Sequence, residues 1–133
     1  MRSNITVLNK LKKQDSNTGL DVWYVTKFKD IKYTKRKVTT VDGINVSMGE
    51  EFIVLFPFND KYLQYSKWKN SDKDNAYTMS QGDIIVFDDY DIVEGTAVNI
   101  AKIKTKYTAC EVRSVEEMEN KYGAVNQLRC SGV

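Results

Sequence analysis

The sequence of 133 residues contains no histidine, one proline and two cysteines. Without histidine, the chain cannot form a Ser-His-Asp or Cys-His nucleophilic centre. Cys110 and Cys130 lack CxxC spacing, and structural zinc needs about four soft ligands, so no such zinc site is expected. The seven glycines are scattered along the chain, so it has no glycine-rich phosphate loop. We therefore expect two reduced thiols, no cofactor and no enzymatic activity.

Long apolar runs are also missing. No segment approaches the roughly 18 apolar residues needed to span a bilayer. The first residues lack the apolar core and small-residue cleavage site of a signal peptide. Hydrophobic residues make up 41% and charged residues 29% of the chain, which is typical of a folded protein. We expect one domain over residues 1–133, in a soluble, cytosolic protein with no membrane contact.

The net charge of +2 hides an uneven distribution. Residues 1–40 contain ten Lys/Arg and three Asp/Glu, whereas residues 41–133 contain ten Lys/Arg and fifteen Asp/Glu. This division predicts one basic and one acidic surface, which suits head-to-tail contacts between copies of the chain. The pI of about 8.4 is lower than expected for a dedicated DNA-binding domain.

What the chain does contain is a series of short segments rich in β-branched and aromatic residues, separated by turn residues. These predicted strands are 4–9, 21–28, 31–41, 44–47, 51–58, 84–88, 110–115 and 125–131. The most apolar, 51–58, should be a central strand covered on both faces that ends or reaches an edge at Pro57. The last two segments predict a hairpin around 120–123.

Two segments predict helix. Residues 96–107 have apolar residues at spacings of three and four, with Thr96 as a candidate N-cap. Residues 66–70 predict a single helical turn capped by Ser66, inside a long loop over 59–79. The whole pattern predicts a mainly β fold: a small β-barrel or sandwich of about seven or eight short strands with one short α-helix.

A cluster of acids lies in and after the segment 77–92, namely Asp83, Asp88, Asp89, Asp91 and Glu94. Clustered carboxylates can bind a hard cation, but the spacing does not match an EF-hand. Aspartate favours turns and is rarely buried. We therefore interpret the cluster as a solvated turn and strand end, and consider metal binding the minor alternative.

Most of the basic excess lies in one segment that we expect to form a hairpin turning at Lys29-Asp30. It contains Lys27, Lys29, Lys32, Lys35, Arg36 and Lys37, interleaved with aromatic residues. Such a surface can bind a phosphate backbone or stack on bases. Alternatively, these lysines form a solvated strand face that discourages aggregation at the edge of the sheet.

The loop over 59–79 contains four aromatic residues, Tyr62, Tyr65, Trp68 and Tyr77. Trp and Tyr are enriched at binding hot spots, so these residues could form a protein interface. They could equally form a satellite cluster that packs beneath the loop. We regard this loop as the preferred partner surface and leave both interpretations open.

Several phrases in the sequence carry a family resemblance. They are NITVLNK, DVWYVTKFKDIKYTKRK, FIVLFPF, the loop KYLQYSKWKNSDKDNAYTMSQGDIIVFDD, and CEVRSV with LRCSGV at the end. The most specific is the phrase at 77–86, which is of the type FxxGDIIV after a lysine-rich aromatic loop. In these features the chain resembles the small neck proteins of long-tailed phages and prophages of Gram-positive bacteria, often labelled minor capsid, head-closure or stopper proteins.

The resemblance implies a structural virion protein without catalytic activity, assembled in the host cytoplasm. Copies would form a ring at the head–tail interface that joins the connector to the tail and surrounds the packaged double-stranded DNA. Its neighbours would be connector or portal-side proteins and tail-side proteins. The basic segment would then face DNA or an acidic partner, and Asp88, Asp89 and Asp91 would face a basic neighbouring subunit. The alternatives are a tail-terminator or other head–tail joining protein, a nucleic-acid-binding β-barrel acting through the 27–37 hairpin, and, remotely, a carboxylate-dependent hydrolase.

Overall fold

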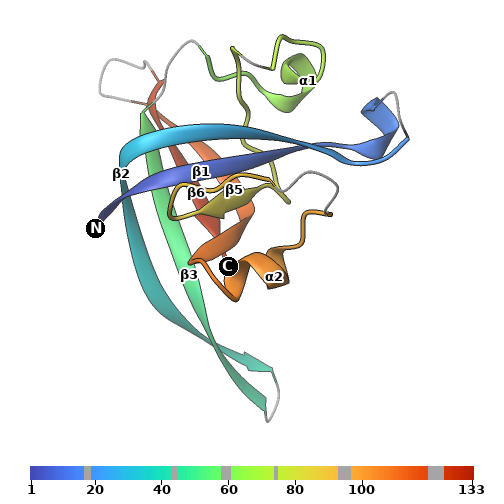
Figure 1. Ribbon diagram of the computed structural model, residues 1–133. Coiled ribbons are helices and arrows are strands. Elements are labelled where there is room, and N and C mark those ends of the chain that lie inside the picture. Colours follow the sequence, from blue (N-terminus) through green and yellow to red (C-terminus); the bar gives the residue numbers. More distant parts are fainter. Residues whose placement is uncertain (17–18, 43–44, 58–60, 74, 93–96, 120–124) are drawn as a thin grey trace.

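Antiparallel strands dominate the computed structural model, which describes residues 1–133 except 17–18, 43–44, 58–60, 74, 93–96 and 120–124 (Figure 1). The strands are β1 (Arg2–Leu11), β2 (Val22–Asp42), β3 (Asn45–Pro57), β4 (Ile84–Val86), β5 (Ala109–Glu119) and β6 (Val125–Gly132). A 3₁₀ helix, η1 (Lys13–Asp15), and two short helices, α1 (Tyr65–Trp68) and α2 (Ile100–Lys104), connect them. The strands close into a barrel in the order β1-β2-β3-β6-β5-β4. The prediction of a mainly β barrel is confirmed.

The strand number differs from the prediction, because two pairs of predicted strands are each one continuous strand. The predicted turn at Lys29-Asp30 is a β-bulge inside β2, where Asn4 of β1 faces both residues. Asp30 has a φ of 54°, a left-handed conformation that aspartate tolerates better than most residues. Its backbone N–H donates to Asn4 Oδ1 at 3.3 Å. The bulge bends β2 so that one strand pairs first with β1 and then with β3 (Figure 1).

The segments 44–47 and 51–58 likewise form the single strand β3. It pairs with β2 without a register shift from Leu55 to Asn45, so the residues between the predicted strands continue the ladder. The strand ends at Pro57, as expected from the missing backbone donor of proline. Phe52, Val54 and Phe56 point into the barrel and are buried. The intervening Ile53 and Leu55 are only half-buried, so the prediction that both faces of this strand are covered was wrong.

The barrel interior is filled by alternating apolar residues of all six strands. Phe28 is partly buried and packs against this core, with ring centroids 5.1 Å from Phe56 and 5.0 Å from Tyr77, both edge-to-face. Such aromatic pairs stabilise a core by about 0.5–1.5 kcal/mol beyond the area they bury. The core also includes Cys110 and Cys130, which are buried and free, as expected for reduced thiols. Burial raises the pKa of each thiol to about 12.

The short strand β4 is covered on both faces. Ile85 points into the barrel core, whereas Ile84 and Val86 pack with Leu8 of β1 in a second cluster outside the barrel. Ile103 of α2 belongs to this outer cluster, so the helix covers the junction of β1, β4 and β5. The buried strand predicted over 84–88 is confirmed for Ile84–Val86, but it ends before Asp88, which is exposed.

Both helices differ from their predicted bounds. The helix predicted over 96–107 contains only one turn and a half, α2, and its cap is Asn99, whose Oδ1 accepts from the N–H groups of Ala101 and Lys102. Thr96 lies outside the described residues. The predicted helical turn in the long loop is α1, which begins at Tyr65, so Ser66 is not its cap. Among the described helices, none is long and apolar enough to cross a membrane.

Candidate functional site

The longest hairpin, formed by β2 and β3, extends beyond the barrel. β6 pairs with β3 only between Phe52 and Pro57, and β1 pairs with β2 only as far as Lys32. Among the described residues, 36–42 of β2 and 45–51 of β3 therefore pair only with each other. We call these two segments the arm. Figure 1 shows the arm extending past the end of the barrel at which α2 and the C-terminus lie. At about 3.3 Å per residue, seven residues per strand give a ribbon of roughly 23 Å.

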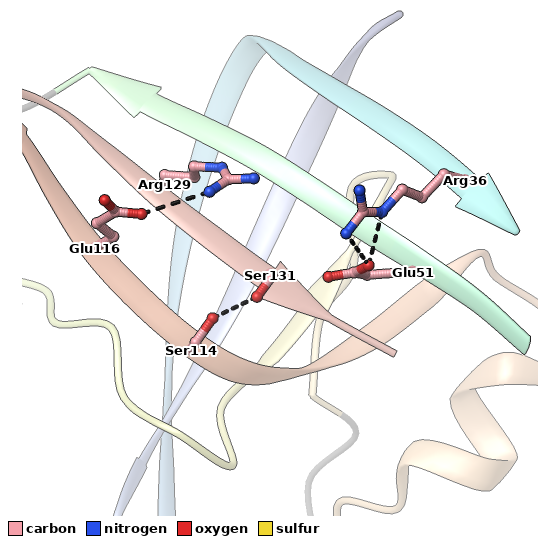
Figure 2. A network of polar contacts seen from close by, with 6 residues as sticks. All are labelled: Arg36, Glu51, Ser114, Glu116, Arg129 and Ser131. Carbon is pink, nitrogen blue, oxygen red and sulfur yellow. Dashed lines mark hydrogen bonds and ion pairs between the residues drawn. The ribbon is translucent and has the colours of Figure 1, made fainter. Parts of the chain in front are cut away.

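The root of the arm contains two cross-strand ion pairs. Arg36 on the outward face donates through Nε to Glu51 Oε2 at 2.8 Å, and its second nitrogen lies 2.7 Å from the same oxygen (Figure 2). Lys35 points to the opposite face, where Nζ lies 3.2 Å from Glu50 Oε2 and 5.7 Å from the centroid of the Phe52 ring. Basic side chains of β2 thus face acidic side chains of β3.

The outward face of the sheet continues this polar pattern towards β5. Arg129 of β6 pairs with Glu116 of β5 at 3.4 Å, and the hydroxyl groups of Ser114 and Ser131 share a hydrogen bond (Figure 2). Exposed pairs of this kind contribute at most about 1 kcal/mol each. These pairs therefore add little stability. They place each arginine next to a glutamate, so this face is locally neutral.

The predicted basic surface is partly neutralised within the subunit. Lys27 lies 3.0 Å from Asp91, and this hydrogen-bonded pairing raises the pKa of Lys27. At this point, a residue of the predicted basic surface therefore pairs with a residue of the predicted acidic surface in the same chain. Lys29, Lys32 and Lys37 are exposed and form no ion pair within the described part of the chain. The segment 27–37 is also not a hairpin, because the single strand β2 continues through it, with a bulge but no turn.

Asp83 is not part of a solvated acidic surface, so that part of the sequence interpretation was wrong. Its side chain is buried, and its carboxylate accepts three hydrogen bonds: from Asn9 Nδ2 at 2.9 Å, from the Lys10 N–H at 3.0 Å and from the Ser80 N–H at 3.0 Å. Burial nevertheless dominates and raises the pKa of Asp83 to about 6. The residue anchors the turn before β4 to β1, where the barrel closes.

The remaining acids of the cluster lie at the end of β4 and beyond it. Asp88, Asp89 and Asp91 are exposed, as expected for a strand end, and Glu94 lies outside the described residues. Asp88 Oδ1 accepts from the Asp89 N–H at 2.8 Å, an ordinary local turn contact. No group of three or more potential metal-ligating side chains occurs among the residues that the structure describes.

The aromatic loop covers the end of the barrel opposite the arm (Figure 1). Trp68 and Tyr77 are 0% and 2% exposed, so these two side chains belong to the interior of the subunit. Burial raises the pKa of Tyr77 to about 12. Tyr62 and Tyr65 are half-buried, and the Tyr65 hydroxyl donates to Asp15 Oδ2 at 2.7 Å. Of the predicted interface residues, only Tyr62 and Tyr65 keep exposed surface on this loop.

A groove of about 400 Å³ lies between β2 and this loop. Its lining includes three aromatic residues, Trp23, Tyr24 and Tyr77, and three lysines, Lys27, Lys61 and Lys73. Lys73 Nζ lies 5.6 Å above the ring centroid of Tyr24, within the range of a cation–π contact. The sequence analysis noted the basic and aromatic residues of β2 but could not place Lys61 and Lys73 beside them.

A family model matches the whole chain, residues 1–133. The chain belongs to DUF6751, a family of unknown function. Neither the curated proteins nor the solved structures contain a significant match to it. Membership of DUF6751 therefore assigns no activity, and the arguments about function depend on the geometry and on the sequence resemblance.

A second hollow, of about 560 Å³, lies at the root of the arm of this DUF6751 member. Its lining includes Lys35 from β2, Glu50 from the arm, Lys104 from α2, and Glu111 and Arg113 from β5. Arg113 lies 3.7 Å from Glu111, so both signs of charge are again balanced locally. The sequence analysis missed this surface, because it depends on β5 and the arm meeting around the barrel.

Proposed function

We propose that this chain is a structural subunit without catalytic activity that forms a ring at the head–tail interface of a tailed phage, in the head-closure or stopper position. One observation carries the proposal: the arm extends from a closed barrel and pairs with nothing else among the described residues of its own chain. An isolated two-stranded ribbon is marginally stable in water, so a partner is needed to hold it in place. The resemblance to phage neck proteins supports the same role.

In this role the barrel is the rigid body of each subunit and the arm makes contacts to neighbours. The exposed cations Lys29, Lys32 and Lys37 are suited to packaged DNA or to an acidic partner. The exposed acids Asp88 and Asp89 are suited to a basic neighbouring subunit. A tail-terminator position in the same region would use the same surfaces, and the partners on either side distinguish the two roles.

The location of the protein is tested directly on particles. Cryo-electron microscopy of purified particles that encode this chain should show its barrel in a ring between the connector and the tail. Density for the chain in the tail tube, or its absence from particles altogether, would contradict the proposal.

The importance of the arm is tested with a shortened hairpin. Replacing residues 38–49 by Asn-Gly leaves Lys37 opposite Glu50 as the closing pair and supplies a favoured two-residue turn. We expect this variant to fold but to be excluded from particles, so that heads and tails accumulate unjoined. The matched control is Gly49→Ala with the full arm, whose added methyl group meets nothing within 4 Å, and it should be incorporated.

The groove between β2 and the aromatic loop favours a second candidate function, the binding of single-stranded nucleic acid. Aromatic rings beside three lysines are the elements that stack on bases and follow a phosphate backbone. Titration with a single-stranded oligonucleotide should then quench the fluorescence of Trp23, with an affinity that falls as salt increases. If Lys73→Ala and Lys27→Ala leave binding unchanged, or if nothing binds at low salt, this candidate fails.

A further inference from the structure

The arm has two free edges. β2 pairs with β1 no further than Lys32, and β3 pairs with β6 no further than Phe52. From there outwards, residues 34–42 of β2 and 45–51 of β3 each leave one row of backbone N–H and C=O groups unpaired among the described residues. Proteins normally shield such edges, because an exposed edge is a template for pairing with another strand.

The two edges carry opposite charges. The β2 edge contains Lys35, Arg36 and Lys37, and the β3 edge contains Glu50 and Glu51. All five side chains are described, and all except the partly buried Glu51 are exposed. One edge of the ribbon is therefore complementary to the other edge of the same ribbon, and not to itself. Such a surface favours head-to-tail contact between identical copies.

We propose that the β2 edge of one copy pairs with the β3 edge of a second copy, so that the arms of neighbouring subunits form one continuous sheet. This interface deepens the proposed ring function and rests on it. When subunits are related by rotation about a common axis, all arms point the same way, so β2 of one arm runs antiparallel to β3 of the next. Antiparallel pairing is the more stable arrangement per residue.

The charge pattern then repeats across the sheet. Within one arm, Arg36 lies beside Glu51 and Lys35 beside Glu50. In the continuous sheet, each basic residue of β2 has a second acidic strand on its other side, at the strand spacing of about 4.8 Å. Opposite charges on adjacent strands stabilise a sheet, and like charges directly opposite destabilise it. Pairing β2 with β2, or β3 with β3, would bring like charges together, so the pattern selects the head-to-tail contact.

The experiment uses two edge variants of the full chain. Arg36→Glu with Lys37→Glu makes both edges acidic, and Glu50→Lys with Glu51→Lys makes both edges basic. Each variant alone should associate at least about tenfold more weakly than the original chain, because its copies place like charges opposite each other. An equal mixture of the two should associate again, since each acidic edge then meets a basic one. Sedimentation velocity measures the association.

The contact itself is located by cross-linking. Equal amounts of unlabelled and ¹⁵N-labelled chain are mixed and treated with a carbodiimide, which joins lysine to nearby carboxylates. We expect mixed-isotope cross-links between Lys35 or Lys37 of one copy and Glu50 or Glu51 of another. The control variant carries all four substitutions, which keeps opposite charges at the directly opposed positions 36 and 51 and at 37 and 50, and it should associate with itself.

Three outcomes overturn the interface: no mixed-isotope cross-link between arms, edge variants that associate as well as the original chain, or a mixture that fails to restore association. Thermal unfolding of each variant shows whether its barrel is intact. The same cross-linking on purified particles separates this inference from the proposed function. If the chain is found at the neck but no arm-to-arm cross-links form, the ring function stands and the interface is refuted. If the arms cross-link in solution but the chain is missing from particles, the interface stands and the neck function is refuted.

Discussion

The barrel and the arm are built from the same two strands, yet they differ in almost every physical respect. In the barrel half of β3, Val54 and Phe56 are buried and β3 has a partner strand on each side. In the arm half, Glu50 is exposed and the outer edge of β3 has no partner among the described residues. The change occurs within two residues, at Glu51 and Phe52. An unbroken strand can thus pass from a structure that holds itself together to one that needs an external partner.

This difference follows from the residues that each half presents. The barrel half buries large apolar side chains, each of which contributes about 1.5–3 kcal/mol when fully removed from water. The arm root instead contains exposed ion pairs such as Lys35–Glu50, which contribute at most about 1 kcal/mol each. Stability therefore resides in the barrel, whereas the arm contributes a surface. Four predictions test this division, from the largest expected effect to the smallest.

Phe56→Ala should produce the largest loss of stability. Phe56 is fully buried and contacts Phe28 in the barrel core, so truncation leaves a cavity that strands closed into a barrel cannot collapse around. We expect the free energy of unfolding to fall by about 3–5 kcal/mol in chemical denaturation. The control in the arm, Lys37→Ala, should change it by less than about 0.5 kcal/mol. Similar effects of the two substitutions would contradict the division into barrel and arm.

The sequence predicted the barrel far better than it predicted the arm. Segments rich in β-branched and aromatic residues identified the strands of the barrel, because strands that bury side chains such as Val54 are built from such residues. The length of the arm was missed, because 44–47 and 51–58 were predicted as separate strands although the residues between them continue the ladder with β2. Local sequence cannot report that a partner strand holds a polar segment in the ladder.

The candidate site was predictable only in part, for the same reason. The basic residues of β2 were identified, but their pairing with Glu50, Glu51 and Asp91 depends on register and barrel closure. Asp83 was interpreted as part of a solvated turn, and for Trp68 a protein interface and a cluster packed beneath the loop were both left open. Both are buried, since the loop folds across the barrel end and the turn before β4 docks onto β1. Contacts between distant segments decided these positions.

The second prediction concerns the pH dependence of the barrel closure. The pKa of Asp83 is about 6 in the folded chain, whereas the ordinary value for an aspartate is 3.8. The folded state therefore binds the proton of Asp83 more tightly than the unfolded state does. Protonated Asp83 therefore adds to the free energy of unfolding below about pH 4, and this addition is lost as the pH rises through about 6. A difference of about 2 in pKa corresponds to roughly 3 kcal/mol.

Denaturation between about pH 4 and pH 7 measures this effect. Asp83→Asn cannot titrate, so the decline in stability over this range should largely disappear. Asp88→Asn is the matched control, because Asp88 lies in the same phrase but is exposed, and it should leave the decline intact. A wild-type chain whose stability rises steadily over this range would show that Asp83 is not the dominant buried acid.

The third prediction compares two glycines, one in each region. A Cβ at Gly132, in the barrel, would lie 2.6 Å from the backbone oxygen of Glu111 and 2.9 Å from Cys110 Sγ. Gly132→Ala should therefore destabilise the chain by about 1–3 kcal/mol, because backbone must move to admit the methyl group. A Cβ at Gly49, in the arm, would meet nothing within 4 Å. Gly49→Ala should be neutral or stabilise by up to about 1 kcal/mol. Thermal unfolding compares the two variants, and equal losses would show that the arm is as tightly enclosed as the barrel.

The smallest effect on stability should come from the largest change, the replacement of residues 38–49 by Asn-Gly. The removed strands pair only with each other, so the barrel loses no partner, and the shorter connection costs less entropy to close. We expect the free energy of unfolding to change by less than about 1 kcal/mol. Hydrogen exchange of the full chain should agree: amides of 36–42 should exchange rapidly, whereas those of Val54 and Phe56 should exchange only with global unfolding. A large loss of stability in the shortened variant would mean that the arm supports the barrel from which it extends. Exclusion of the shortened variant from particles would then reflect poor folding, and it would no longer support the arm as a surface for partners.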